Sequence, residues 1–378
     1  MPAKIDPFYA MEINRLAHRL KAEGRSVIHM EYGQPSTGAP QKAIALAHRV
    51  LDSDGMGYWE SAALQAGLAR RYRESYGLTI EPERFVLTCG ASPALVLALA
   101  ANFEAGDRVA IARPGYVAYR NVVKALHLVP VEIACDDSTR YQLTAGHLEA
   151  IDPPPAGVIV ASPANPTGTI IEAGELDAIA RLCRARRIAI ISDEIYHGLS
   201  YVGPAQTLLR YDPGAFVVGS FSKYFSMVAW RLGWLLAPAG KVERARAFSG
   251  NMFLTAPSLS QHAALAALEA RDELEANVSV YRRNRDLLLE ALPRLGLNRI
   301  APPDGAFYFY IDVRHLTDDS LAFCKRLLRD TGVATAPGID FDPVDGRHHI
   351  RLSFAVSTSE IEDAIGRLER WFASPPRD

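Results

Sequence analysis

The sequence predicts an open, mostly parallel α/β sheet with a smaller α+β unit, and three observations support this fold class. Short apolar runs that end in polar, glycine or proline residues recur through the middle of the 378-residue chain. Helix-like segments, such as residues 92–103 and 172–187, lie between these runs. From about residue 271 the pattern changes to one long amphipathic helix followed by strand, helix and strand. Buried strands that alternate with helices are typical of parallel sheets covered on both faces.

Five runs supply the expected strands of the large sheet: residues 84–92, 107–116, 156–168, 187–196 and 215–223. Each contains about four to six apolar residues before the polar or turn residues begin. In open parallel sheets, ligands bind outside the carboxyl ends of the strands. The polar residues that end these runs are therefore expected to converge on one crevice.

Residues 271–292 predict a long helix, because apolar residues recur at helical spacing: Leu274, Val278, Tyr281, Leu288 and Leu292. Its length suggests that it bridges two domains. Residues 305–313, 321–332 and 348–356 then predict a strand, a helix and a strand. We expect a large domain over 40–284 and a small domain from 1–39 plus 285–378. Within the small domain, the helix-like segment 9–23 is expected to pack against the C-terminal part.

Composition and charge narrow the function classes. A formal net charge of −2 gives no general attraction to nucleic acid or anionic membrane. The four cysteines are isolated in sequence, the N-terminus lacks the apolar core of a signal peptide, and no apolar run is long enough for a bilayer. We therefore expect a cytoplasmic protein that binds neither nucleic acid nor membrane.

Several common sites are absent from the sequence. It contains no GxGxxG after a strand, no GxxxxGK[ST], no HExxH and no cysteine–histidine metal spacing. The adjacent His348 and His349 are interpreted as edge-strand residues and not as a metal pair, so no metal is expected.

The stretch "TCGASPAL", residues 88–95, ends a strand and begins a helix. Gly90 allows a tight turn, Ser92 can cap the helix and Pro93 fits its first turn. Free N–H groups at such a helix start bind anions, phosphate included. An ordinary capped helix explains the same residues.

Polar residues also end the next strands. Asp193 and Tyr196 stand at the end of the stretch 187–196, after its apolar residues, and a buried carboxylate there requires a cationic partner such as a protonated pyridine nitrogen. Asn165 lies between two prolines in "SPANPTG", so its amide is held in a rigid turn. A solvated strand-end acid and a plain loop remain the alternatives.

The stretch "GSFSKYFSMVAWRLGW", residues 219–234, places Lys223 among aromatic residues, with Arg231 eight positions later. Desolvation and a second cation lower the pKa of a lysine, which makes its amine nucleophilic. Ser220 and Arg231 could bind a phosphate while Lys223 attacks an aldehyde. A surface loop with inward-packing apolar residues is the alternative. Together, the anion site, acid, amide, tyrosine and lysine form the set that pyridoxal phosphate requires.

The motifs "YGQPSTGAP", "SPANPTG", "SDEIY", "SFSK" plus arginine, and "IRLSFA" occur in this order over nearly the whole chain. In this respect the sequence resembles the fold-type I pyridoxal-phosphate enzymes, specifically the class I/II aminotransferases of the aspartate aminotransferase family. The resemblance implies the transferase fold of that group, with a mostly parallel sheet of the seven-stranded type, and a homodimer with shared active sites.

The resemblance also implies roles for individual residues. Lys223 would form the Schiff base, Asp193 would pair with the pyridine nitrogen, and Asn165 and Tyr196 would hydrogen-bond the phenolic oxygen. Tyr116 would stack on the ring, Arg351 would bind the substrate carboxylate beside Gly33, and Tyr58 would reach the neighbouring subunit's phosphate. The phosphate itself would be held by Gly90, Ala91, Ser92, Ser220 and Arg231.

These roles imply ping-pong transamination between an amino acid and a 2-oxo acid. A C–S β-lyase of the cystathionine or cysteine-S-conjugate type would use the same lysine, acid and arginine, and it stays open as the alternative. A cofactor-binding regulatory domain is not expected, because such a domain would need an attached DNA-binding domain and the aminotransferase-like region takes up nearly the whole sequence.

Departures from the family pattern concern the substrate. Trp59 and Ala63 replace a threonine and a glycine, Val117 stands where proline is frequent, and Asp342 replaces a glycine. Asn251 occupies the place where dicarboxylate-specific members have an arginine. With Tyr9, Tyr32, Trp59 and Tyr116 expected nearby, these changes favour a neutral or aromatic amino donor.

Overall fold

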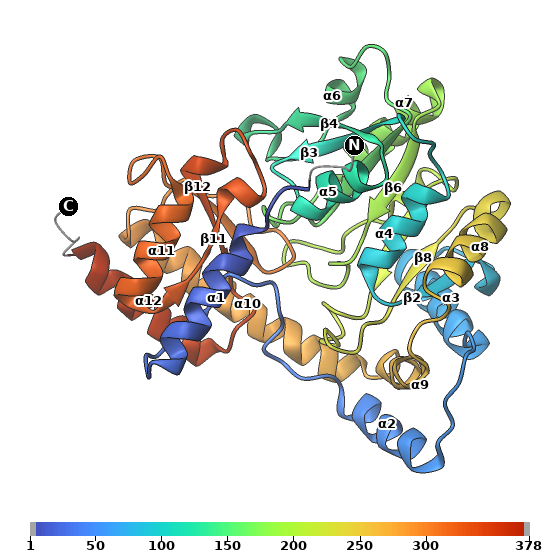
Figure 1. Cartoon of the computed structure of the whole chain (residues 1–378), viewed down its shortest axis with the longest axis horizontal. Coiled ribbons are helices and arrows are strands. Elements are labelled where there is room, and N and C mark those ends of the chain that lie inside the picture. The colour runs from blue at the N-terminus through green and yellow to red at the C-terminus, as the bar shows by residue number, and fades with distance from the viewer. Residues whose placement is uncertain (1–4, 374–378) are drawn as a thin grey trace.

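The large sheet of the computed structural model, which describes residues 5–373, has seven strands in the order β2-β8-β7-β6-β5-β3-β4 (Figure 1). Strands β3 to β7 run parallel, and β8 is antiparallel to both β7 and β2. The strands are β2 (Phe85–Thr88), β3 (Arg108–Arg113), β4 (Val129–Ala134), β5 (Gly157–Ala161), β6 (Ala189–Asp193), β7 (Phe216–Ser220) and β8 (Gly233–Leu236). The predicted α/β class with a mostly parallel sheet is confirmed.

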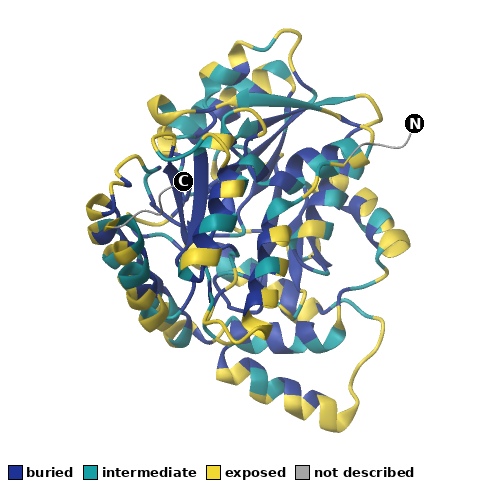
Figure 2. Cartoon of the chain, turned by 60° about the vertical axis from the view of Figure 1, so that its left-hand side comes forward, coloured by how far each residue is buried: buried dark blue, intermediate teal, exposed yellow. Residues whose placement is uncertain are grey.

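Helices cover both faces of this sheet because its buried strands alternate their side chains between two apolar layers. On β3, for example, Val109 and Ile111 pack in one layer and Ala110 in the other. The helices from the N-terminal half of the chain are α1 (Tyr9–Ala22), α2 (Gln41–Ser53), α3 (Ala62–Tyr76), α4 (Ala91–Ala100), α5 (Val117–Ala125), α6 (Ala145–Glu149) and α7 (Ala173–Arg186). Figure 2 shows most strands of the sheet in the buried colour, with exposed residues on the outer sides of the helices, whereas the edge strand β4 is only partly buried.

A smaller group of elements lies on the left in Figure 1, where the first and last parts of the chain meet. It contains an antiparallel sheet in the order β11-β12-β9 and a two-stranded parallel sheet, β1-β10. Its strands are β1 (Ile28–His29), β9 (Tyr308–Asp312), β10 (Val333–Ala334), β11 (Ala336–Pro337) and β12 (His349–Ser353). The remaining helices are α8 (Val242–Met252), α9 (Ser258–Ala267), α10 (Arg271–Arg294), α11 (Ser320–Thr331) and α12 (Thr358–Ala373).

Two expectations about helices are confirmed. The N-terminal helix α1 packs against α11 and β11 of the smaller group. The long helix α10 contacts both groups, since its Glu275 accepts a hydrogen bond from Tyr224 at 2.7 Å while its Asn284 donates to the Phe354 carbonyl at 3.0 Å. The domain boundaries at 40–284 and at 1–39 plus 285–378 stay a prediction, and residues 1–4 and 374–378 lie outside the described residues.

Among residues 5–373, no helix is both long enough and apolar enough to cross a bilayer. Nor does any group of three or more histidine, cysteine or acidic side chains in this part of the chain form a candidate metal site. His349 is buried and stacks on Tyr310, with ring centroids 4.7 Å apart.

Candidate active site

A cavity of about 460 Å³ opens where β5, β6 and β7 end and where the N-terminal segment crosses from the smaller group of elements. Eleven of the predicted site residues line it: Gly33, Ala91, Ser92, Tyr116, Asn165, Asp193, Tyr196, Ser220, Lys223, Arg231 and Arg351. Residues from both ends of the chain thus meet at the carboxyl edge of the sheet, as expected for an open α/β fold.

Lys223 lies in the turn after β7, and its amine donates a hydrogen bond to the Gly33 carbonyl at 2.6 Å. The side chain keeps some exposure because it faces the cavity, but protein atoms surround it closely. Desolvation, aided by the positive charges of Arg351 and Arg231, lowers the pKa of Lys223 to about 8, although Asp193 opposes the shift. A large fraction of this amine is therefore neutral near pH 8, as a nucleophile requires.

Asp193 ends strand β6 and is buried. The Tyr119 hydroxyl donates to its Oδ2 at 2.6 Å, and the Ile195 N–H donates to its Oδ1 at 3.2 Å. Burial raises the pKa of Asp193 to about 6 even though both hydrogen bonds and the Lys223 charge favour the ionised form. A cation placed against this carboxylate would relieve its desolvation.

The start of helix α4 forms one wall of the cavity. Gly90 precedes the helix with φ of +99°, a conformation that favours glycine. A Cβ at this position would lie 2.2 Å from the Arg231 Nη2, so the arginine packs directly on the glycine backbone. The N–H groups of the first helical turn, the Arg231 guanidinium and the Ser220 and Ser222 hydroxyls meet at this wall and suit a phosphate dianion.

Arg351, on β12, is buried between two aromatic rings. Its guanidinium carbon lies 4.5 Å from the Tyr308 ring centroid and 4.6 Å from that of Phe341. It donates to Asn165 Oδ1 at 2.9 Å and to the Glu31 carbonyl at 2.5 Å. Its buried Nε has no hydrogen-bond partner within the described chain, so this arginine still has capacity to bind an acceptor.

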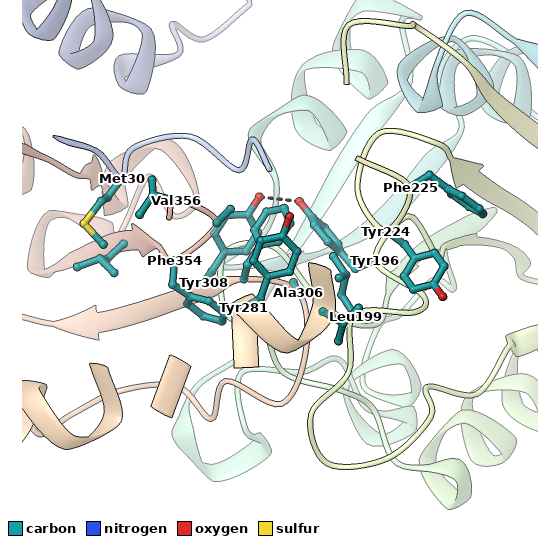
Figure 3. Close-up of a cluster of buried hydrophobic side chains, with 14 of the residues drawn as sticks. Met30, Tyr196, Leu199, Tyr224, Phe225, Tyr281, Ala306, Tyr308, Phe354 and Val356 are labelled. Carbon is teal, nitrogen blue, oxygen red and sulfur yellow. Dashed lines mark hydrogen bonds between the residues drawn. The ribbon is translucent and has the colours of Figure 1, made fainter. Parts of the chain in front are cut away.

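Tyr196 and Tyr308 form a buried pair whose hydroxyls are 2.7 Å apart, marked by the dashed line in Figure 3. Tyr308 comes from β9 and Tyr196 from the segment after β6, so their contact joins the two groups of elements. Around them pack Tyr281, Phe354 and Leu199, which keep this side of the site apolar (Figure 3).

Sequence reasoning missed Tyr119, Tyr308 and Ser222, although all three line the cavity. Tyr119 lies in the first turn of α5, three residues after the N-cap residue Tyr116, and the two rings are in contact with centroids 5.6 Å apart, so this spacing could have indicated Tyr119. Nothing in the sequence distinguishes Tyr308 from the other aromatic residues of "GAFYFYIDV".

Other predicted residues lie away from this cavity. Tyr58 is 86% exposed and lines a separate surface hollow together with Trp59. Asp342 instead accepts a hydrogen bond from Arg113 at 2.8 Å, and Asn251 is exposed on α8. Tyr32 and Tyr116 do line the cavity, as the substrate hypothesis requires, whereas Tyr9 does not.

The donor set fits pyridoxal phosphate in its chemistry. A nucleophilic amine suits its aldehyde, a buried carboxylate suits a protonated ring nitrogen, and the wall beside Gly90 suits a phosphate. Arg351 has no part in this set and can bind a substrate carboxylate, which suits a planar guanidinium.

Comparisons with known proteins agree with this chemistry. The family model for aminotransferase class I and II matches residues 25–368. The chain is 46% identical to a valine–pyruvate aminotransferase of Mycobacterium tuberculosis, over 98% of each protein. Two solved structures are also similar. One is an aminotransferase from Mycobacterium tuberculosis, with a TM-score of 0.95, 46% identity, and coverage of 98% of this chain and 97% of that one.

The other structure is an aspartate aminotransferase from Thermus thermophilus with maleate, with a TM-score of 0.90, 31% identity and coverage of 97% of each chain. Members of this family are pyridoxal-phosphate-dependent enzymes that transfer amino groups between amino acids and 2-oxo acids, and the lyase alternative is not favoured. The chain therefore belongs to the class I and II aminotransferases.

Proposed function

We propose that this chain transfers the amino group of a neutral amino acid to a 2-oxo acid, using pyridoxal phosphate bound at Lys223. One observation carries the proposal. The Lys223 amine, whose pKa is lowered to about 8, lines the same cavity as the buried Asp193, the start of α4 and Arg351.

The cofactor would be held by residues on several elements. Lys223 would bind its aldehyde carbon, Asp193 its ring nitrogen, and Asn165 and Tyr196 its phenolic oxygen. Tyr116 would stack on the ring. The phosphate would be held by Gly90, Ala91, Ser92, Ser220 and Arg231. When bound, pyridoxal phosphate supplies an electron sink that stabilises negative charge at the substrate α-carbon.

The residues of the chain itself bind the substrate and move its proton. Arg351 would bind the substrate carboxylate with paired N–H donors, next to Gly33, and so fix the α-carbon near Lys223. The Lys223 amine would accept the α-proton in its neutral form and return it as an ammonium group. Such positioned proton transfer contributes roughly 10²–10⁴ in rate.

A neutral amino donor is supported by the charges of the lining. Among the described residues that line the cavity, the basic ones are Lys223, Arg231 and Arg351, each already given a role. Apolar and aromatic side chains supply much of the remaining wall: Phe8, Met11, Tyr32, Leu95, Val122 and Val228. A similar protein is named for valine and pyruvate, and we propose that pair for this chain.

A homodimer with shared sites is part of the proposal. Tyr58 is exposed beside further exposed apolar residues, Leu51, Met56 and Leu254. The two stretches that carry them are adjacent, since the Gly57 N–H donates to the Ser258 Oγ at 3.4 Å. Covering this surface with a second copy would bury apolar area and bring Tyr58 toward the partner's phosphate site.

Mixing two inactive variants tests the shared site. Neither Lys223→Ala nor Tyr58→Ala alone is expected to show full activity, but mixed dimers would contain one site with both wild-type residues. Recovery of activity after unfolding and refolding the mixture supports the shared dimer, and no recovery together with a monomeric mass in light scattering contradicts it.

Purified protein saturated with pyridoxal phosphate should convert valine and pyruvate to the matching oxo acid and alanine. Aspartate should be a poorer donor, because no further arginine of the described chain lines the cavity to bind its side-chain carboxylate. Release of pyruvate with ammonia and a thiol from cysteine conjugates would support the lyase instead. The cytoplasmic location also stays a proposal, which cell fractionation tests.

A further inference from the structure

His197 lies immediately after the predicted catalytic segment, yet it does not line the cavity. Its side chain is only 8% exposed. The Nε2 atom lies 3.0 Å from the main-chain oxygen of Ser162, and the Nδ1 atom lies 2.7 Å from the Tyr76 hydroxyl. Both ring nitrogens are therefore used in contacts with separate segments of the chain.

The chemistry of these partners fixes the tautomer. A main-chain carbonyl can only accept, so Nε2 must carry the proton that is shared with Ser162. Burial lowers the pKa of His197 despite the nearby Glu194 carboxylate, and the ring is therefore neutral at neutral pH. Nδ1 is then a lone-pair acceptor, and the Tyr76 O–H, whose pKa burial raises, donates to it.

The competing arrangement is an imidazolium paired with Glu194. The Glu194 Oε2 lies 3.4 Å from Nδ1 but makes no hydrogen bond to it. The other oxygen, Oε1, already accepts from the Ser192 and Thr207 hydroxyls and from the Leu208 N–H, at 2.9 to 3.0 Å. The hydrogen-bond donors to Glu194 are therefore at Oε1, the oxygen that does not face His197. In addition, the positive charge of Arg71 on α3 opposes protonation of the ring.

The contact with Ser162 connects His197 to the loop after β5, which carries Asn165. Ser162 follows β5 and leads into the turn that holds Asn165, whose Oδ1 accepts from Arg351 at 2.9 Å. His197 itself directly follows Tyr196, and its N–H donates to the Glu194 carbonyl at 3.0 Å. One further link joins the same two loops, from the Ser162 N–H to the Asp193 carbonyl at 3.4 Å.

We propose that His197 is a positioning residue for transamination, which as a neutral imidazole fixes the loop of Asn165 against the turn of Asp193 and Tyr196. The inference rests on the proposed function of these three residues. Tyr76, at the end of α3, anchors the ring from the opposite side and keeps its plane fixed. Hydrogen bonds at both nitrogens orient an imidazole more tightly than packing alone.

Nitrogen-15 NMR of protein labelled at histidine tests the tautomer without any substrate. The signals of His197, assigned by their loss in His197→Gln, should show a protonated Nε2 and an unprotonated Nδ1 from pH 7 to pH 8. A protonated Nδ1, or a ring that titrates in this range, would overturn the proposal and favour the pair with Glu194.

Activity of two variants tests the positioning role. His197→Phe keeps the ring volume but removes both hydrogen bonds, so kcat for the amino donor should fall between about 10-fold and about 100-fold. His197→Gln keeps an N–H at a similar distance from the main chain, and it should recover kcat to within about threefold of wild type. Equal kcat for His197→Phe and wild type, or equal loss in both variants, contradicts the positioning role.

These outcomes are distinct from failure of the proposed function. If wild-type protein neither binds pyridoxal phosphate nor transaminates, the proposed function fails, while the NMR result still decides the tautomer. If His197→Phe does not fold, as judged by circular dichroism, the comparison of His197→Gln with wild type and the NMR pH series decide the matter. An inactive, folded His197→Gln that binds cofactor normally would then count against the inference alone.

Discussion

The amine of Lys223 donates a hydrogen bond to the main-chain oxygen of Gly33, 2.6 Å away, and so joins segments 190 residues apart. Gly33 also packs closely against the Tyr308 ring, which comes from strand β9 of the smaller group of elements. The close approach requires glycine, because a Cβ at Gly33 would fall 1.7 Å from the Tyr308 hydroxyl oxygen. Three distant parts of the chain therefore meet at one backbone position.

Gly33→Ala is expected to disable the site. The new methyl group must displace either Tyr308, in which case Tyr196 loses its partner, or the segment that carries the Gly33 carbonyl, in which case Lys223 loses its acceptor. We expect kcat/KM for the amino donor to fall by at least about tenfold and the free energy of unfolding to drop by about 1–3 kcal/mol. Steady-state kinetics and urea unfolding measure the two effects.

Gly38→Ala is the matched control, since a Cβ there meets nothing within 4 Å. It lies in the same N-terminal segment and should leave both kinetics and stability near wild type. If the two glycine variants behaved alike, crowding against Tyr308 would not be the cause of any loss.

The reactivity of Lys223 should follow its lowered pKa. In cofactor-free protein the amine becomes neutral as the pH rises through about 8, so acylation of Lys223 should increase up to that pH and then level off. An ordinary lysine would show this midpoint near pH 10.4. Competitive labelling with mass spectrometry, with the exposed Lys42 as internal reference, measures the profile.

Removing a neighbouring cation should move that midpoint in a defined direction. Arg351→Gln removes a positive charge that lowers the pKa of Lys223, so the midpoint should shift to higher pH. A midpoint that stays at the same pH in this variant would show that the Arg351 charge does not contribute to the lowered pKa of Lys223.

Arg351→Lys should impair carboxylate binding despite conserving the charge. The planar guanidinium stacks between Tyr308 and Phe341 and also holds Asn165, and a lysine ammonium cannot reproduce this geometry. We expect kcat/KM for amino acids to fall roughly 10²-fold, mostly through KM, which corresponds to about 3 kcal/mol. Amines without a carboxylate should lose much less, and exposed Arg347→Lys is the control.

Much of this site could be predicted because each chemical group ends an apolar run. Asp193 and Ser220 are the last residues of buried strands and Asn165 lies in the turn after another, and parallel strands bring their carboxyl ends together. Strand β4 was missed because its residues are only partly buried and so show no apolar run. Strand β8 was also missed, although its residues form a short apolar run, because nothing local shows that it inserts antiparallel between β2 and β7.

Tyr119 and Tyr308 were missed for a related reason. Each acts through a contact with a residue far away in sequence, Asp193 and Tyr196 respectively, and such pairing depends on the folded arrangement of elements. Likewise, the main-chain oxygens of Glu31 and Gly33 carry no side-chain signal at all, yet they accept from Arg351 and Lys223.

Asp193→Asn is expected to stabilise the cofactor-free protein while it impairs transamination. Burial raises the pKa of Asp193 from 3.8 to about 6, so the folded state binds its proton more tightly than the unfolded state does. Stability from this group is therefore greatest at low pH and is lost as the pH rises from about 4 through 6. At pH 7.5 the ionised carboxylate carries the full penalty, which a neutral amide avoids.

The melting temperature of the cofactor-free Asp193→Asn variant should therefore exceed that of wild type at pH 7.5, and the difference should be smaller at pH 5. Transamination should fall by at least about 100-fold, because the amide cannot stabilise a cationic ring nitrogen. Tyr119→Phe provides the comparison. Loss of its 2.6 Å hydrogen bond should raise the pKa of Asp193 further and reduce kcat by about tenfold, since the carboxylate itself remains. An Asp193→Asn variant that melts below wild type at both pH values would show that the carboxylate is already paired favourably in the folded chain.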